Sequence, residues 1–168
     1  MRKRKTEKAP DPEAVMVRLA GLCARSEQCE ADIRKKLLTA RIQAADAEKI
    51  VERLRADGFI NDARFAGSYA RDKVRFSAWG RNKVRLGLMA KRIPSEIIDE
   101  ALASVERKDY IEALLRAAAA KSRTLDLEDF DDRARLYRHL LSRGFESGLA
   151  SKAVARMRTI ARDGMDCQ

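Results

Sequence analysis

The chain has 168 residues, of which 45% are hydrophobic and 37% charged, and its formal net charge is +10. Ala, Leu, Arg, Glu and Lys dominate and only three prolines occur, which favours helix nearly everywhere and argues against a sheet protein. The positive surplus predicts attraction to a polyanion: nucleic acid, an anionic membrane or an acidic protein.

A membrane location is not expected. No uncharged apolar run approaches the roughly 20 residues that a transmembrane helix needs. Residues 1–5 are basic, but no apolar segment follows them, so they do not form a signal peptide. We therefore expect a cytoplasmic protein.

The residues that usually carry chemistry are sparse. His139 is the single histidine, and Cys23, Cys29 and Cys167 form no Cys-x-x-Cys pair, so a zinc site lacks ligands. We expect Cys23 to be a small core residue in a reducing compartment. The acidic segment 126–132 lacks the EF-hand pattern and its glycine, which indicates a loop that caps the next helix. We expect no metal, no cofactor and no enzymatic activity.

The N-terminal part predicts a tail followed by three short helices. Residues 1–10 are charged and are expected to form a disordered basic tail. Asp11 caps a first helix with Pro12 at its first position. Ser26 is the expected N-cap of a second helix, and a third is expected at about 45–57.

A tight corner should follow the third helix. Gly58 is suited to the left-handed conformation that ends a helix, and Asn61 is a good N-cap for the next one. Asp62 then stands at the positive end of the helix dipole. With Asn61 as the cap, Ile60 and Phe65 are placed to form a hydrophobic staple.

The same plan recurs twice more. Five apolar positions repeat at a shift of 51 residues and then of 52: Ile33, Leu37, Ile42, Val51 and Leu54; Val84, Leu88, Ile93, Leu102 and Val105; Leu136, Leu140, Phe145, Val154 and Met157. The recurrence predicts an all-α, elongated tandem array of three three-helix repeats that share a continuous core. We place the repeats at 11–60, 61–106 and 107–160, with a flexible C-terminus at 161–168.

The corner and the residues after it resemble a known family. The run Gly-Phe-Ile-Asn-Asp-Ala-Arg-Phe-Ala at 58–66 is followed by Tyr69-Ala70-Arg71, Trp79-Gly80, Val84, Leu88, Lys91 and Ile93. This succession resembles the RecX family of bacterial regulators of the RecA recombinase. The chain departs from the family pattern at Ala63, usually an acid, and at Arg92, usually a glycine. The resemblance implies three three-helix units and a RecA filament as partner, with strand exchange, ATPase and coprotease activity limited by binding.

Basic residues recur on the second helix of the second and third repeats. Under the repeat alignment Arg81 matches Arg133 and Lys83 matches Arg135, whereas the first repeat has Glu30 and Asp32 there. The expected binding residues are Arg71, Lys73, Arg81, Lys83, Arg85, Lys91, Arg92, Arg133, Arg135 and Arg138. Trp79, the single tryptophan, is expected to pack rather than to stack on a base.

Two other functions stay open. A helix-turn-helix DNA reader is disfavoured because its recognition helix would carry Glu96, Asp99 and Glu100, of the wrong sign for phosphates. Non-specific binding to single- or double-stranded DNA remains compatible with the basic surface. A scaffold with an acidic protein partner is the second alternative. The chain is expected to be a monomer.

Overall fold

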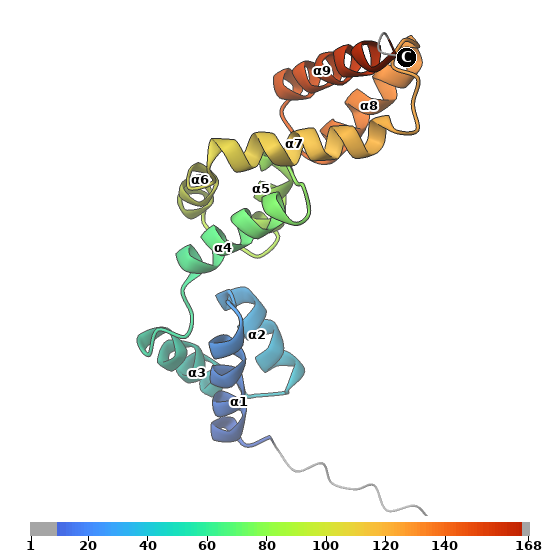
Figure 1. Cartoon of the computed structure of the whole chain (residues 1–168). Helices are drawn as coiled ribbons and strands as arrows, with labels where there is room; N and C mark the ends of the chain where they lie inside the picture. Colours follow the sequence, from blue (N-terminus) through green and yellow to red (C-terminus); the bar gives the residue numbers. More distant parts are fainter. Residues whose placement is uncertain (1–9, 166–168) are drawn as a thin grey trace, which may run out of the picture. The chain divides into compact units, whose positions relative to one another are not determined.

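The computed structural model describes residues 10–165, in which every regular element is an α-helix. The helices are α1 (Pro12–Arg25), α2 (Glu30–Thr39), α3 (Ala44–Ala56), α4 (Asp62–Arg75), α5 (Arg81–Met89), α6 (Ser95–Ala103), α7 (Arg107–Ser122), α8 (Phe130–Ser142) and α9 (Ser147–Met165) (Figure 1). The prediction of an all-α chain of three helix triplets is confirmed. The expected basic tail at 1–10 lies, apart from Pro10, outside the described residues.

The helices group into two compact units, one ending at Phe65 and one beginning at Ala66. The second unit therefore holds most of the second triplet together with the third. At the C-terminal end, α9 continues past Ile160, where the sequence suggested a flexible segment, to Met165. In the described part of the chain, no helix combines the length and the apolar composition of a membrane span.

The repeated apolar positions form the cores. Of the fifteen residues that define the repeat, fourteen are buried, and only Val154 is half-buried. The first unit encloses Val15 and Leu19 of α1, Ile33 and Leu37 of α2, and Ile50, Val51 and Leu54 of α3. One difference concerns Val105, which is buried in the turn after α6, whereas its counterpart Leu54 lies within α3. The repeat spacing of the buried residues therefore continues into the turn that follows a helix.

The corner at 58–62 has the predicted geometry. Gly58 has φ +75°, and the Asn61 side-chain oxygen accepts from the backbone N–H of Arg64 at 2.8 Å. Ile60 and Phe65 are both buried. Asp62 has a role that the sequence did not indicate, because its carboxylate accepts from the backbone N–H of Glu30 at 2.9 Å and so caps α2.

One expectation for the first unit is wrong, and another holds in part, since Cys23 packs against the core but is only partly buried. Ser26 does not cap α2; it ends α1, and its N–H donates to the carbonyl of Leu22. The helix starts later, at Glu30, because a cap is available there from Asp62, which is distant in sequence. The fully buried cysteine is Cys29, whereas Cys23 is half-buried, and burial together with Glu27 raises the pKa of its thiol.

An ion-pair network on α2 and α3 holds the first unit together. Glu30 accepts from Arg34 at 2.7 Å and from Arg55, and Arg34 also bridges to Glu48 at 2.5 Å. Burial raises the pKa of Glu30, but the hydrogen bonds from Arg34 and Arg55 outweigh it, so the pKa lies below its usual value. Ionised Glu30 therefore stabilises the fold at pH values above its pKa in the unfolded chain.

The first prediction concerns this network. Glu30→Gln should lower the free energy of unfolding by about 1 kcal/mol at neutral pH, because the charge-assisted hydrogen bonds are lost. The folded-state pKa lies below the unfolded one, so the loss should fade as the pH drops through about 4 and lower. Urea unfolding followed by circular dichroism at several pH values measures this. Glu52→Gln, an exposed carboxylate on α3, is the control, and an equal, pH-independent loss in both variants would contradict the assignment.

In the second unit, the second and third triplets meet backbone to backbone. The Gly80 N–H donates to the carbonyl of Arg143 at 2.8 Å, and the Asn82 N–H donates to that of Gly144 at 3.1 Å. A Cβ atom on Gly80 would collide with the backbone of Gly144, and one on Gly144 with that of Lys83. Gly144 also has φ +88°, which disfavours any other residue.

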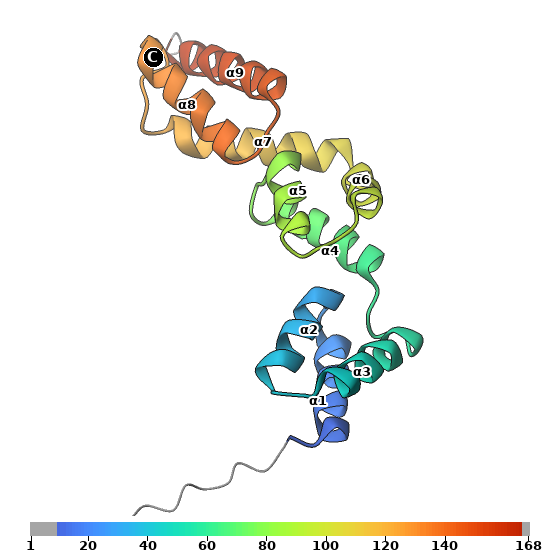
Figure 2. The same ribbon diagram turned by 180° about the vertical axis from the view of Figure 1, so that it is seen from behind.

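Side chains complete this junction. The Tyr110 hydroxyl on α7 accepts from the Arg81 N–H at 3.0 Å and donates to Glu146 at 2.6 Å. The Arg81 guanidinium lies 4.2 Å from the Tyr110 ring centroid and 3.3 Å from the Glu146 carboxylate. Arg143 donates to the carbonyls of Ser77 and Ala78. Helix α7 lies against α8 and α9 (Figures 1 and 2), and its Tyr110 links it to the start of α5, so α7 belongs to both halves of the second unit.

The second prediction tests the close backbone approach. Gly144→Ala should lower the free energy of unfolding by about 3 kcal/mol, from the collision with Lys83 and the positive φ. Thermal unfolding followed by Trp79 fluorescence measures it. Gly148→Ala is the matched control, because a Cβ there meets nothing within 4 Å, and its effect should stay within about 0.5 kcal/mol. Equal stability of the two variants would disprove the close approach.

Candidate partner-binding surface

Two of the predicted binding lysines surround Trp79. The ammonium groups of Lys73 and Lys83 each lie 4.9 Å from the centroid of the Trp79 ring, and Lys73 also lies 5.4 Å from that of Tyr69. Cation–π contacts of this kind contribute about 0.5–1 kcal/mol each. The half-buried indole is therefore occupied within its own unit and does not present a free platform for a base.

Several of the predicted binding arginines make contacts within their own unit. Arg81 belongs to the Tyr110 junction, and Arg85 pairs with Asp99 at 2.5 Å. On α8, Arg135 pairs with Asp132 at 2.7 Å. These residues do recur at matching repeat positions, but the recurrence serves intramolecular contacts as well as surface charge.

Arg133 also makes contacts within its own unit. It donates to the carbonyls of Leu127 and Glu128 at 2.9 and 2.8 Å and lies 5.8 Å from the Phe130 ring centroid. These contacts close the loop before α8. Contacts within its own repeat therefore account for the position of the Arg133 side chain.

Among the remaining predicted residues, Arg71, Arg92 and Arg138 are exposed. Arg71 contacts Ser68 at 3.4 Å, and Arg138 contacts the carbonyl of Ala134 at 3.3 Å. Lys91 is half-buried, and its neighbour Arg92 is exposed. The Arg92 backbone N–H donates to the carbonyl of Met89 at 2.9 Å, and its side chain makes no hydrogen bond, ion pair or ring contact with another described residue.

The backbone at Arg92 is unusual. Arg92 and Arg41, which occupy the same position in two repeats, have φ values of +59° and +58°, and the third repeat has Gly144 there with φ +88°. The left-handed conformation costs a non-glycine residue about 1–2 kcal/mol. Both arginines are exposed, so packing does not explain them. Strain kept where glycine would relieve it is typical of a side chain with a function.

An exposed apolar residue precedes each of these positions by three residues. Leu38 is 78% exposed, Met89 56% and Leu141 39%, and the three are equivalent under the repeat alignment. Leu86, one turn before Met89 on α5, is 65% exposed. We call Leu86, Met89 and Arg92 the helix-end patch of the second repeat; Leu38 and Arg41 are its counterparts in the first.

The sequence reasoning missed the apolar members of this patch. Leu38, Met89 and Leu141 each directly follow a buried core leucine, so helical periodicity alone does not mark them as exposed. The repeat shifts of 51 and 52 residues do align them, and this was the signal available in the sequence. An apolar side chain beside a cation suits a protein surface better than bare phosphates.

Groups suited to catalysis or metal binding do not assemble. Among residues 10–165, the side chains of His, Cys, Asp and Glu nowhere form a group of three that could hold a metal ion. In the acidic segment 126–132, Asp129 caps α8 as predicted, with its carboxylate accepting from the Asp132 N–H at 2.9 Å, and Glu128 pairs with Arg158 at 2.8 Å. Burial, Arg143 and Lys121 lower the pKa of His139.

The fold and the patch define a class: a protein of three-helix repeats whose charged and apolar surface residues suit binding. Family models for the second and third three-helix domains of RecX match residues 61–102 and 108–154. A regulatory protein RecX from Prosthecochloris aestuarii is 31% identical over 82% of this chain and 89% of its own length. One from Thermus thermophilus is 31% identical over 79% and 84%. The chain belongs to the RecX family, whose members are regulatory proteins and not enzymes.

Two further comparisons describe the extent of this similarity. The chain spans 66% of the length of the RecX protein from Clostridium beijerinckii, to which it is 25% identical, and 56% of that from Clostridium acetobutylicum. The crystal structure of RecX from Lactobacillus salivarius has a TM-score of 0.74 at 19% identity and covers 86% of this chain and 95% of its own. A second RecX crystal structure has a TM-score of 0.73 at 23% identity, over 83% and 70%. The solved structures support the fold.

Proposed function

We propose that this protein regulates a RecA recombinase in the cytoplasm. It binds as a monomer along the groove of the RecA–DNA filament and limits strand exchange, ATP hydrolysis and coprotease activity. Family membership supports this partner. The observation that carries the proposal is the helix-end patch, because its apolar residue and its strained arginine recur at one repeat position, as suits a partner whose own surface repeats.

The contact surface that we propose is narrower than the ten basic residues of the sequence pattern. It consists of the helix-end patch together with Arg71, Lys91 and Arg138. The helices that carry this surface are held in place in part by the contacts of Arg81, Arg85, Arg133 and Arg135. The cation–π contacts of Lys73 and Lys83 with Trp79 contribute in the same way. Truncating these supporting residues would weaken binding mainly through the fold.

The third prediction separates function from stability at Arg92. Arg92→Gly should raise the free energy of unfolding by about 0.5–1 kcal/mol, because glycine relieves the strain although it loses more entropy on folding. The same variant should inhibit RecA ATPase several-fold less strongly. Arg92→Lys, which keeps the charge and the strain, is the control and should inhibit nearly as well as the parent. A more stable Arg92→Gly protein with full inhibition would remove Arg92 from the surface.

The fourth prediction concerns the apolar part of the patch. Replacing Leu86 and Met89 together by Ser should weaken co-sedimentation with RecA filaments on single-stranded DNA by about tenfold or more. Stability should change by less than about 0.5 kcal/mol per site, because both side chains are exposed. Phe76→Ser, at a side chain that is 77% exposed outside the patch, is the control. Equal co-sedimentation of all three proteins would refute a protein contact here.

Direct, non-specific DNA binding is the second candidate function, favoured by the net charge of +10. It makes a different prediction for the same variants. If bare DNA were the target, affinity for DNA alone would match affinity for the filament and would fall steeply with salt. Loss of the apolar residues would then leave binding unchanged.

A further inference from the structure

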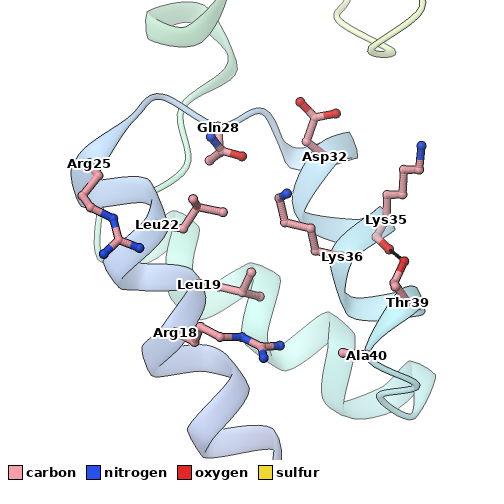
Figure 3. A pocket seen from close by; sticks show the side chains of 10 residues that line it. All are labelled: Arg18, Leu19, Leu22, Arg25, Gln28, Asp32, Lys35, Lys36, Thr39 and Ala40. Atoms are coloured by element: carbon pink, nitrogen blue, oxygen red, sulfur yellow. Dashed lines mark hydrogen bonds between the residues drawn. The ribbon is translucent and has the colours of Figure 1, made fainter.

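A groove runs between α1 and α2 within the first unit. Its volume is about 960 Å³. It is lined by Arg18, Leu19, Leu22, Arg25, Gln28, Asp32, Lys35, Lys36, Thr39 and Ala40 (Figure 3). The sequence analysis placed little positive charge in this repeat, because it compared only the positions aligned with the basic helices of the other two.

The lining is apolar at its floor, which is formed by the buried Leu19 and the half-buried Leu22, and cationic at its edges. Leu19 and Leu22 project from α1 toward α2, and Ala40 closes one end (Figure 3). Arg18 on α1 and Lys36 on α2 are both exposed and flank this apolar strip. Counting Arg25 and Lys35, the lining carries four cations and a single carboxylate, that of Asp32.

Three other carboxylates of this unit pair with arginines outside the groove lining. Glu30 and Glu48 bind Arg34 on the side where α2 meets α3, and Glu27 binds Arg64 at 2.5 Å. Neither Arg18 nor Arg25 makes an ion pair with a described carboxylate. The groove therefore keeps a net positive edge that the fold itself does not neutralise.

We propose that this groove binds an acidic amphipathic helix of a partner protein. The apolar strip accepts side chains at i and i+4, and the cations on both edges pair with flanking Asp or Glu residues. Since α2 has 10 residues and is therefore about 15 Å long, it accommodates about three turns of a partner helix. A nucleic acid suits this site less well, because its phosphates gain no favourable contact from the apolar side chains of Leu19 and Leu22.

The acidic segment of a second copy of this chain is a poor occupant. In segment 126–132, Glu128 pairs with Arg158, and Asp129 and Asp132 accept from backbone N–H groups. These carboxylates already have partners within their own unit. The proposed occupant is therefore a different protein, and the proposal does not depend on RecA regulation.

The test uses the full chain and a synthetic helical peptide of about 12 residues. Leucines at i, i+4 and i+8 form one face of the peptide, and glutamates flank them. Fluorescence anisotropy should show saturable binding. The double variant Arg18→Glu and Lys36→Glu should weaken it at least tenfold, and Leu22→Ser should weaken it several-fold. Lys49→Glu, at an exposed lysine on α3 outside the groove, is the control for a single charge reversal elsewhere on the unit and should bind like the parent.

Two comparisons decide between the occupants. A peptide of the same composition with its pattern scrambled should bind at least fivefold more weakly than the amphipathic one. Equal binding of the two peptides, or no effect of Leu22→Ser on a folded protein, would reduce the site to general charge attraction and overturn the proposal. Single-stranded DNA that binds as tightly and displaces the peptide, with the same dependence on Arg18 and Lys36, would assign the groove to nucleic acid instead.

Discussion

The second unit depends on the place where two backbones touch. Gly80 and Gly144 bring the start of α5 against the end of α8 at a distance that no side chain allows. This approach aligns the backbone hydrogen bonds from Gly80 to Arg143 and from Asn82 to Gly144. Packing of this kind is stiff, because any shift would break directional hydrogen bonds as well as van der Waals contacts. It joins two small helix triplets into one body with a shared core.

The contacts at this junction also engage the charged side chains near it. Arg81 and Arg143 look like surface cations in the sequence, but their guanidinium groups satisfy Glu146, Tyr110 and two carbonyls of the preceding turn. A charge of this kind is retained for structure, and removing it would leave buried partners unpaired. The net charge of +10 therefore overstates what is available for binding.

Arg41 and Arg92, the two arginines with positive φ, contrast with Arg81 and Arg143. Arg41 and Arg92 stand where the third repeat uses Gly144, two or three residues after the last residue of the second helix of each triplet. The fold needs only a backbone with positive φ there, and glycine supplies that most cheaply. An exposed arginine at this position lowers the stability of the fold, and backbone strain of this kind is often found at binding sites. The exposed apolar residue three positions before each arginine would give the proposed contact surface a second kind of contact.

The sequence by itself determined the helical class, the triplet repeat and nearly all of the core. The reason is that burial repeats with the chain: Leu37, Leu88 and Leu140 are apolar because each faces the same kind of interior. Local caps at Asp11 and Asn61 also follow from neighbouring residues. Only the tertiary structure decided contacts between residues distant in sequence. Asp62 caps α2 in place of Ser26, and Arg85 pairs with Asp99, because folding brings together groups that no local pattern relates.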